Sequence, residues 1–582
     1  MLKLLKYVKK YWYFAILAPT FMFLEVFMDM LLTLFMEKMV DFGVQTGNIN
    51  NIIKYGLLML LFLFIGVACG ILSGVFTNLT SFKFSNDLRK DVFKKIMHLS
   101  YNQTDKFSTG SLVTRVTNDI TQVQNLLSMA LRMFIRALSF FILGIVFTLN
   151  INIEFGYILL IILPIEILVI IIFVKLAFPI FSVIQTKLDK VNTIVHENLT
   201  GARVVKAFSK EDYEYSRFKG ANDEYTQKNL YVGKISAFLM PILMIIVYIG
   251  QIVIYYVGGN SILEASKNAL KINDMILVGE ISQAITYISM ICMSIMMLGM
   301  IFTSLARATA SAKRINEVLD CEEEIKDGKK DINLEETGTI EFKNVSFKYP
   351  GSSSYSLQNI SFKANKGDVI AIVGATGSGK STLVNLITRF YDVSEGEILV
   401  DNINVKDYTQ KELRNKVAIC LQKAELFSGT IKDNIKWGKE DASIEEVDEA
   451  CSIAQAKEFI LSKEKGYDEY VEEKGTSLSG GQKQRLSIAR AIIKKPEILI
   501  FDDSTSALDL VTEAKLHQAM NEKIKDITKI IVAQRISTAR NAKKIIVLDN
   551  GQIVGFDTHD NLMKNCEIYI DIYNSQLKKG GN

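Results

Sequence analysis

Long apolar segments dominate the first half of the chain. Six stretches are long enough to cross a bilayer as helices, namely Trp12 to Val40, Tyr55 to Phe82, Leu126 to Leu149, Phe155 to Phe181, Val232 to Gly258 and Met275 to Leu305. From Thr339 onward, short apolar runs alternate with amphipathic stretches, which is typical of an α/β domain. The pattern predicts a helical membrane domain over residues 1–315, a charged linker over 316–338 and a second domain over 339–582.

Basic residues are distributed unevenly between the connections. The first-to-second and third-to-fourth connections contain the segments DFGVQTGNINN and NINIE, neither of which has a Lys or an Arg. The other two long connections carry many, namely Lys83, Arg89, Lys90, Lys94, Lys95, Lys106 and Arg115, and then Lys187, Lys190, Arg203, Lys206, Lys210, Arg217, Lys219 and Lys228. The positive-inside rule therefore predicts that both termini and everything after Leu305 lie in the cytoplasm of a multi-pass protein of the cell membrane.

Composition excludes several classes of protein. With 49% hydrophobic and 22% charged residues, the chain is too apolar to be disordered. A net charge of +4 on 582 residues gives no indication of nucleic acid binding. The six cysteines are scattered without a C-x-x-C pair, so neither a disulfide framework nor a zinc site is indicated. The basic, then apolar N-terminus lacks a cleavage site, and we interpret it as a retained first membrane helix.

The two long basic connections have the properties of helices rather than loops. Neither contains Pro, and Lys83 to Thr109 also lacks Gly. At 1.5 Å per residue, about 25 extra residues would carry a helix roughly 35 to 40 Å into the cytoplasm. We expect the first of these helices to turn back at Gly110.

Some residues within the spans have two interpretations. Glu25 and Asp29 share a face of the first helix, where they form either a cation-accepting or gating site, or a structural pair bonded to polar groups or water. A methionine stripe on the sixth helix is either a wall for apolar cargo or plain packing, and comprises Met290, Met293, Met297 and Met300. Gly66, Gly70 and Gly74 predict close helix packing only.

A phosphate-binding loop follows the apolar run VIAIV. It has the full G-x-x-x-x-G-K-[ST] pattern between a strand and a helix, and comprises Gly374, Ala375, Thr376, Gly377, Ser378, Gly379, Lys380, Ser381 and Thr382. Its backbone amides surround phosphates, Lys380 reaches the β- and γ-phosphates, and Ser381 coordinates Mg²⁺. ATP and Mg²⁺ are therefore the expected ligands.

Two further motifs are consistent with nucleotide chemistry. The strand Ile498 to Phe501 ends in Asp502 and Asp503, and a carboxylate at a strand end beside the phosphate loop holds the metal. The second motif opens a helix ended at Pro496 and comprises Leu478, Ser479, Gly480, Gly481 and Gln482. The start of such a helix is a second site that can bind an anion. One chain therefore has two surfaces that can bind phosphate, and we expect it to have a partner.

Together, these motifs and the six spans resemble an ATP-binding cassette (ABC) exporter half-transporter over essentially the whole chain. The resemblance implies a type I ABC exporter-like membrane domain followed by a P-loop cassette with a RecA-like core and a helical subdomain. It also implies that two cassettes dimerise head to tail, with each ATP between the phosphate loop of one and the LSGGQ segment of the other.

The resemblance assigns roles to further positions. Tyr349 matches the aromatic residue that stacks on adenine, and Gln422 matches the glutamine that touches Mg²⁺ and the attacking water. Ser506 to Asp509 match the loop that senses the opposite site. Segments near Asp105 to Ser111 and Ser209 to Tyr215 match short transverse helices that contact the cassettes, and Glu472 to Gly475 match a cross-linking loop.

The chain departs from the family pattern at two catalytic positions. Asp503 stands where the family has the Glu that acts as catalytic base, and Gln534 stands where it has a switch His. These departures resemble the degenerate-site subunit of heterodimeric bacterial multidrug exporters. They imply a chain that holds ATP at its own site, and a partner half-transporter that supplies Glu and His.

The expected function is therefore ATP-driven export of hydrophobic or amphipathic compounds by a heterodimer. The chain would be an ATP hydrolase coupled to transport, with catalysis mainly at the site completed by the partner. Two alternatives stay open: a homodimeric exporter of lipid or peptide, and a nucleotide-gated channel or regulatory subunit. The six spans exclude a soluble repair ATPase, and no nucleic acid partner is expected.

Overall fold

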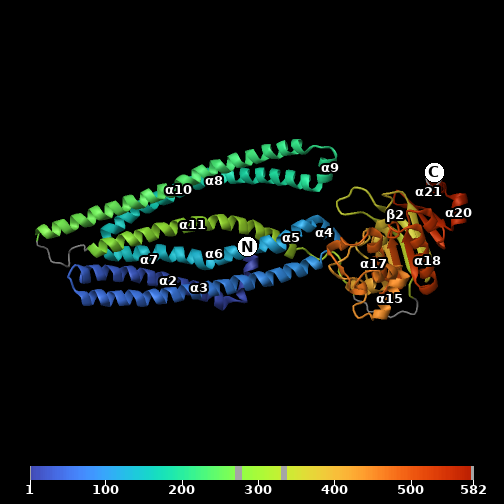
Figure 1. Cartoon of the computed structure of the whole chain (residues 1–582), viewed down its shortest axis with the longest axis horizontal. Coiled ribbons are helices and arrows are strands. Elements are labelled where there is room, and N and C mark those ends of the chain that lie inside the picture. The colour runs from blue at the N-terminus through green and yellow to red at the C-terminus, as the bar shows by residue number, and fades with distance from the viewer. Residues whose placement is uncertain (1, 269–277, 329–336, 578–582) are drawn as a thin grey trace. The chain divides into compact units, whose positions relative to one another are not determined.

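The computed structural model describes residues 2–268, 278–328 and 337–577, and the chain within them forms two compact units (Figure 1). The membrane unit comprises Met1–Met97 and Thr109–Cys321. The cassette unit comprises His98–Ser108 and Glu322–Asn582. The expected start of the sixth span at Met275 and the linker residues 329–336 lie outside the described residues.

Six long apolar helices in the described residues of the membrane unit are candidate spans, which confirms the predicted six-span architecture. Their main helices are α2 (Trp12–Met39), α3 (Ile49–Met97), α7 (Ile135–Ile151), α8 (Ile153–Thr200), α10 (Glu211–Asn268) and α11 (Val278–Leu319). Smaller elements are η1 (Leu2–Leu5), α1 (Lys6–Lys9) and η2 (Val40–Val44) at the N-terminal end. The third span is assembled from α5 (Thr109–Thr114), η3 (Arg115–Asp119), α6 (Ile120–Met129), η4 (Ala130–Phe134) and α7.

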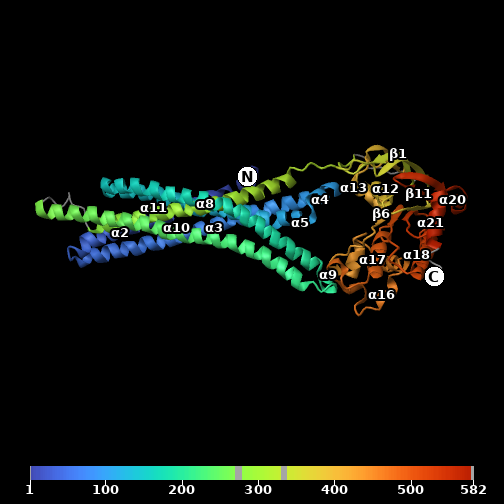
Figure 2. The ribbon, with the colours of Figure 1, turned by 90° about the horizontal axis from the view of Figure 1, so that it is seen from above.

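Close helix packing joins α2 to α3. A Cβ atom on Gly66 would lie 3.3 Å from Cβ of Met28, and one on Gly70 would lie 3.0 Å from the carboxylate carbon of Glu25. Larger side chains would force the two helices apart, so the glycine pattern has the packing role predicted from the sequence. Helices α8 and α10 lie side by side in both views (Figures 1 and 2).

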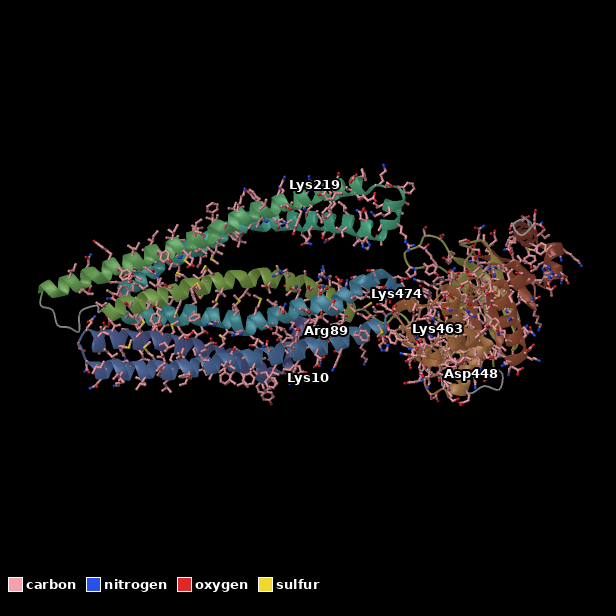
Figure 3. The ribbon with its side chains drawn as sticks, viewed as in Figure 1. Lys10, Arg89, Lys219, Asp448, Lys463 and Lys474 are labelled. Atoms are coloured by element: carbon pink, nitrogen blue, oxygen red, sulfur yellow. The ribbon has the colours of Figure 1, made fainter. Side chains whose placement is uncertain are left out.

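Basic side chains gather at one end of the membrane unit. Figure 3 shows Lys10, Arg89 and Lys219 in the half of the bundle where α9 (Ala202–Ala207) lies, away from the end at which α2 and α3 are joined. Some are neutralised locally, since Lys10 Nζ lies 2.8 Å from Oδ2 of Asp87. Clustering of Lys and Arg at one end is what the positive-inside rule expects of the cytoplasmic side.

The two short transverse helices begin earlier than the sequence motifs suggested. Helix α3 ends at Met97 and α4 spans Tyr101–Phe107, whereas Gly110 lies inside α5. Ser100 caps α4 through a reciprocal capping box, and Ser108 ends it with φ of 58°. In the second connection α9 precedes Ser209, which has φ of 48°. The prediction of a turn at Gly110 was therefore wrong, because α3 already ends at Met97 and Ser108, in the left-handed region, ends α4.

The described residues of the cassette unit form three sheets. A six-stranded sheet has the order β12-β11-β3-β10-β9-β6, in which only β12 is antiparallel to its neighbour. Its strands are β3 (Val369–Gly374), β6 (Val417–Cys420), β9 (Ile498–Asp502), β10 (Thr528–Val532), β11 (Lys544–Asp549) and β12 (Gln552–Asp557). An antiparallel sheet has the order β2 (Leu357–Ala364), β1 (Ile340–Phe347), β4 (Glu395–Val400) and β5 (Ile403–Asn404). A small pair joins β7 (Gly429–Thr430) and β8 (Tyr470–Val471).

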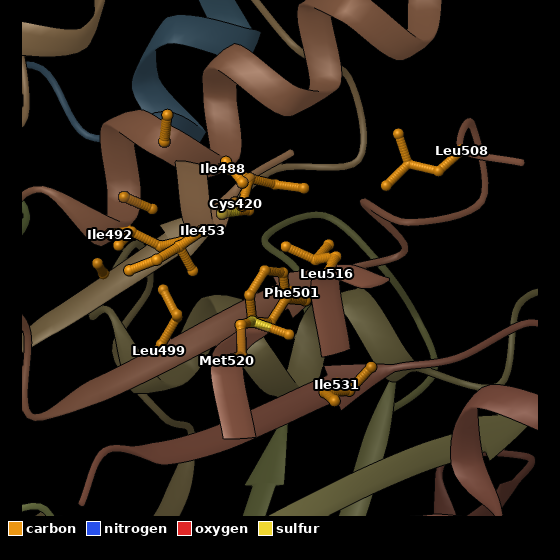
Figure 4. Close-up of a cluster of buried hydrophobic side chains, with 14 of the residues drawn as sticks. Cys420, Ile453, Ile488, Ile492, Leu499, Phe501, Leu508, Leu516, Met520 and Ile531 are labelled. Atoms are coloured by element: carbon orange, nitrogen blue, oxygen red, sulfur yellow. The ribbon is translucent and has the colours of Figure 1, made fainter. Parts of the chain in front are cut away.

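Residues of β9 face alternately into two cores, as the period of a strand requires. Leu499 and Phe501 join a core that includes Ile488 of the helix Gly480–Ile492 (Figure 4), whereas Ile498 and Ile500 join a second core. The helices of the unit are α4, α12 (Lys380–Ile387), α13 (Gln410–Lys416), α14 (Ile431–Lys436), α15 (Ile444–Ile453), α16 (Lys457–Leu461), α17 (Gly480–Ile492), α18 (Leu510–Lys523), α19 (Ile536–Ala539), α20 (His559–Asn565) and α21 (Glu567–Leu577). The 3₁₀ turns are η6 (Gly466–Asp468) and η7 (Glu473–Gly475). These two cores fix the strand ends that carry the site described next.

Helix α4 packs within the cassette unit although the helices on either side of it belong to the membrane unit. The Tyr101 ring stacks on Phe390 with centroids 4.4 Å apart, and the Arg414 guanidinium covers the Phe390 ring at 5.4 Å. Oγ of Ser100 donates to Glu324 Oε2 at 2.6 Å. An aromatic contact and a charge-assisted hydrogen bond thus hold α4 in place.

Candidate functional site

The loop between β3 and α12 needs glycine at several positions. Gly374, Gly377 and Gly379 have φ of 157°, 86° and 99°, which side chains other than glycine rarely adopt. A Cβ atom on Gly374 would also lie 2.2 Å from the carbonyl oxygen of Leu548, and one on Gly379 would lie 2.8 Å from that of Ser356. The loop is therefore built from close backbone approaches, as the sequence predicted for a phosphate cradle.

The inner surface of this loop fits an anion. Gly379 is the N-cap of α12 and provides no side-chain cap, so the first amides of the helix are left for a ligand. The buried Oγ of Ser378 has no hydrogen-bond partner among the described residues. Ala375, Thr376 and Gly377 form the exposed tip. An orphaned hydroxyl beside free helix amides is suited to the phosphates of a nucleotide.

Lys380 lies across the loop. Its Nζ donates to the carbonyl oxygens of Gly374 at 3.0 Å and Ala375 at 2.7 Å. Burial lowers the pKa of Lys380, and the nearby carboxylates of Asp503 and Asp502 oppose that effect. The ammonium group thus stands where loop and carboxylates meet, which is the position from which it can pair with phosphate.

The expected metal ligands are in contact. Oγ of Ser381 donates to Oδ1 of Asp502 at 2.9 Å, and Asp502 is buried at the end of β9. Burial raises the pKa of Asp502, although the Ser381 hydroxyl lowers it in part. A hydroxyl and a carboxylate oxygen at this spacing are ligands of the kind Mg²⁺ prefers.

Tyr349 also reaches the loop. Its hydroxyl lies 3.1 Å from Oγ1 of Thr382, and its ring meets Phe347 edge-on, with centroids 4.9 Å apart. The ring is thereby fixed at the margin of the phosphate cradle, where an aromatic surface is available to a nucleobase.

Two predicted residues, Gln422 and Gln534, donate to one carboxylate oxygen of a third, Asp503. Nε2 of Gln422 donates to Oδ2 of Asp503 at 3.1 Å, and Nε2 of Gln534 donates to the same oxygen. Asp503 has φ of 50° and is buried. Burial raises the pKa of Asp503, and the hydrogen bonds from Gln422 and Ser506 act in the opposite direction. One oxygen of the expected catalytic base is thus already bound by two amides.

The LSGGQ segment forms the exposed start of α17. Ser479 is the N-cap and exchanges a capping box with Gln482, in which the Ser479 amide donates to Gln482 Oε1 at 3.0 Å. Leu478 is buried as an anchor, whereas a Cβ atom on Gly480 would meet nothing within 4 Å. A Cβ atom on Gly481 would lie 3.2 Å from the Ala507 carbonyl oxygen, in the predicted sensing loop. The start of α17 is therefore exposed on its outer side, whereas on its inner side it lies close to the predicted sensing loop.

Glu513 is a residue that the sequence analysis missed. Its Oε1 accepts hydrogen bonds from Thr505 at 2.8 Å and Thr538 at 2.7 Å, and its Oε2 accepts one from Arg535 at 3.0 Å. These partners flank Asp503 on one side and Gln534 on the other. In the sequence, Glu513 is simply an acidic residue in the first turn of a helix. Acidic residues are common there because they interact favourably with the helix dipole, so the sequence did not single it out.

The membrane carboxylates have a basic partner that was also missed. Nη2 of Arg136 lies 3.5 Å from Oε1 of Glu25 and 3.8 Å from Oδ2 of Asp29, and its guanidinium covers the Phe140 ring. This geometry favours the structural interpretation of the acidic pair over a free cation site. Two arginines inside the third apolar segment, Arg132 and Arg136, were the available signal.

The methionine stripe is divided between two environments. Met290 packs against the cluster that contains Met22 and Phe140, whereas half of the Met293 surface is exposed. The side chain of Met300 lies outside the described part of the chain. Packing accounts for Met290, and the exposed Met293 is the member that cargo or lipid can reach.

Comparison with known proteins assigns the family. The model of the ABC transporter transmembrane region matches residues 15–280, and that of the ABC transporter domain matches residues 357–506. The chain is 38% identical over 583 residues to the ABC transporter ATP-binding protein YfiB of Bacillus subtilis, and the match covers 100% of both chains. The chain belongs to the ABC transporter family. It is thus an ATP-binding membrane protein whose ATPase activity is coupled to transport.

Two further relatives place it among ABC exporters. The chain is 34% identical to the putative multidrug export ATP-binding/permease protein YgaD of Bacillus subtilis, over 84% of this chain and 83% of that one. Its fold matches a bacterial Atm1-family ABC exporter with ATP bound, with a TM-score of 0.79 and 25% identity over 97% of this chain and 98% of that one. ABC exporters work as dimers, so the ABC transporter described here requires a second half-transporter.

Proposed function

We propose that this ABC transporter is one half of a heterodimeric exporter whose own nucleotide site binds ATP and hydrolyses it slowly. The proposal rests on the hydrogen bonds that Asp503 accepts. Its Oδ2 accepts amides from both Gln422 and Gln534, in a chain that lacks the Glu and His of the family pattern.

Asp503 is poorly suited to be a general base. Its carboxylate is one methylene closer to the backbone than that of Glu, roughly 1.5 Å, and such a displacement costs on the order of a hundredfold in rate. Donors that already occupy Oδ2 further reduce the ability of that oxygen to accept a proton from water. Gln534 can donate a hydrogen bond to a phosphate oxygen, but it never becomes a cation as an imidazolium does.

The other residues of this chain's own nucleotide site support the binding of ATP. The loop amides and Lys380 would hold the phosphates, Ser381, Asp502 and Gln422 would hold Mg²⁺, and Tyr349 would stack on the adenine. When bound, Mg²⁺ would neutralise charge on the phosphate oxygens. The chain's own residues therefore bind and orient ATP, whereas proton abstraction is the step that they perform weakly.

The second nucleotide would lie on the LSGGQ segment of this chain. Leu478 to Gln482 present an outward-facing helix start, which is suited to the γ-phosphate of a nucleotide held by another cassette. That cassette would contribute the Glu and the His. Hydrolysis in the assembled pair would then occur mainly at the partner's base, and two like chains would have two impaired sites.

A groove on the cassette unit supports assembly with a second chain. It has a volume of about 370 Å³ and is lined in part by Phe427 and Trp437, whose rings stack with centroids 4.1 Å apart. The transverse helix α9 and the residue after it expose Val204 and Phe208 to the extent of 61% and 71%. We propose that α9 of the partner chain inserts these apolar side chains into the groove and transmits cassette closure to the membrane helices.

Transport would follow alternating access. Closure of the cassettes would open the helix bundles outward, and hydrolysis at the partner-completed site would reset them. The mostly apolar bundle and the similarity to YgaD, a putative multidrug export protein, support hydrophobic or amphipathic small molecules as cargo, taken from the cytoplasm or the inner leaflet. The basic end of the membrane unit supports a cytoplasmic location for both termini and the cassette.

The test is to purify the chain alone and together with its co-expressed partner. We expect ATP binding in both preparations and rapid phosphate release only from the pair. Rapid hydrolysis by the pure chain would contradict the degenerate site and favour a homodimeric exporter. ATP-dependent conductance without uphill transport would favour a nucleotide-gated channel instead.

A further inference from the structure

Gln576, near the C-terminal end of α21, binds the backbone on both sides of the Gln534 side chain. Its Nε2 donates to the carbonyl oxygen of Gln534 at 2.7 Å, and its Oε1 accepts from the amide of Ile536 at 2.8 Å. One primary amide thus bridges the segment from Ala533 to Ile536, here called the switch segment, as a neighbouring strand would do.

The core of the cassette unit fixes the helix that carries Gln576. Tyr569 of α21 is fully buried, and its hydroxyl lies 2.8 Å from Nδ1 of His559. Tyr569, Tyr573 and Gln576 are spaced at i, i+4 and i+7, so they share one face of the helix. The amide of Gln576 is therefore presented from a rigid support.

The ends of the switch segment are also fixed. The Ala533 amide donates to the Ile372 carbonyl oxygen at 3.0 Å, and Ile536 is buried. Arg535, which lies between them, is bound by Glu513. The backbone of Gln534 is held from the α21 side by the bond from Gln576 to its carbonyl oxygen, so this bond sets how far its side chain reaches toward Asp503 and the phosphate loop.

We infer that Gln576 is a positioning residue that aims Gln534 at the γ-phosphate and so gives this chain's own site its preference for ATP over ADP. The inference rests on the proposed function, because it takes Gln534 to be the γ-phosphate contact. It adds that the C-terminal helix determines how firmly the slow site retains ATP. ADP lacks the group that Gln534 would touch, so its binding is independent of this bond.

The experiment measures equilibrium binding to the purified full-length chain. The probes are the fluorescent N-methylanthraniloyl derivatives of ADP and of a β,γ-imido ATP analogue, each with Mg²⁺, so that hydrolysis plays no part. We expect Gln576→Ala to weaken binding of the ATP analogue about three- to tenfold, as loss of two hydrogen bonds at the switch would, and to change ADP binding by less than about twofold. Ser575→Ala is the matched control, because the Ser575 hydroxyl bonds only within α21, to Ile572.

A double-mutant cycle separates positioning from general destabilisation. If Gln576 acts through Gln534, the pair Gln534→Ala and Gln576→Ala binds the ATP analogue as Gln534→Ala alone does, within about twofold. Gln576→Glu keeps an acceptor for Ile536 but loses the donor to Gln534, so we expect it to behave like Gln576→Ala. Thermal unfolding of each variant checks that it is folded.

Several outcomes would overturn the inference. Equal weakening of both nucleotides by Gln576→Ala would show a purely structural role, and additive losses in the double variant would show that Gln576 acts elsewhere. If Gln534→Ala weakens the ATP analogue but Gln576→Ala does not, this inference fails and the proposed site stands. If Gln534→Ala itself has no effect, the assignment of Gln534 in the proposed function fails as well.

Discussion

Gln534 donates its side-chain amide to Oδ2 of Asp503, so the two residues that depart from the exporter pattern are bound to each other. Under the proposed function, this contact would hold the carboxylate in a position from which it is a weak base. A change at Asp503 would remove the acceptor of the Gln534 side chain, whereas a change at Gln534 would leave Oδ2 of Asp503 bonded to Gln422 alone.

Restoring both residues should restore catalysis at this site. We expect Asp503→Glu with Gln534→His to raise turnover there on the order of tenfold to a hundredfold, because the base would regain its reach and the switch could become cationic. The measurement is phosphate release by the assembled pair, with the partner's own base inactivated. Asp503→Asn with Gln534→His is the control, and an unchanged rate in the Glu and His variant would argue against a degenerate site.

Lys380→Ala should abolish nucleotide binding at this chain's own phosphate loop. The ammonium group bridges two loop carbonyls, and its loss removes both that bridge and the charge that would face the phosphates. Photocrosslinking of radiolabelled azido-ATP measures the effect, and the exposed Lys411→Ala serves as the comparison. Crosslinking to the phosphate loop that persists in Lys380→Ala would place the nucleotide elsewhere.

A bulky residue at Ser479 should stop hydrolysis in the other chain. Ser479→Arg would fill the exposed start of α17, so the γ-phosphate held by the partner could no longer approach it. We expect phosphate release by the pair to fall more than about tenfold while ATP stays bound at this chain's phosphate loop. Ser477→Arg, just before the motif, is the control. Normal turnover in Ser479→Arg would contradict a head-to-tail arrangement.

The membrane triad of Arg136, Glu25 and Asp29 makes a prediction about stability. Arg136→Leu leaves two carboxylates without their cation and should lower the stability by about 1 to 3 kcal/mol. Adding Glu25→Gln and Asp29→Asn should recover most of that loss if the triad is structural. Thermal unfolding in lipid nanodiscs measures both variants. Transport that is lost in the triple variant although stability is recovered would support a cation site instead.

The aromatic groove should determine assembly. Trp437→Ala removes a ring that is 64% exposed and stacked on Phe427, and should weaken association with the partner about tenfold or more if α9 of that chain seats there. Co-purification yield and size-exclusion profiles report the effect. Leu461→Ala, which is 59% exposed on α16, provides the control. Equal losses in both variants would show that the groove has no special role.

The nucleotide loop was the most predictable part of this protein. Its glycines, Lys380 and Ser381 are adjacent in sequence, and the conformation they require is local, so the pattern alone indicates the geometry. The six spans were equally accessible because hydropathy reports directly on transfer into lipid.

Contacts between segments that are far apart in the chain could not be predicted from the sequence. Gln576 lies 42 residues from Gln534, and nothing in its surroundings indicates which backbone its amide will meet. The contact of Arg136 with Glu25 could not be predicted either, because helix packing decides which face of the third span turns toward Glu25. The position of α4 was misjudged because its ends are set by the Ser100 cap and by Ser108 in the left-handed region, whereas the sequence analysis expected the turn at Gly110.

Helix α4 has a consequence for how the protein can be divided. The backbone passes between the two units at Met97 to His98, at Ser108 to Thr109 and at Cys321 to Glu322. A cassette excised as one continuous fragment from Glu322 would lack Tyr101, so the ring of Phe390 would lose its aromatic stacking partner. A fragment made to study the ATPase domain of this transporter would therefore have to keep α4 packed on the cassette.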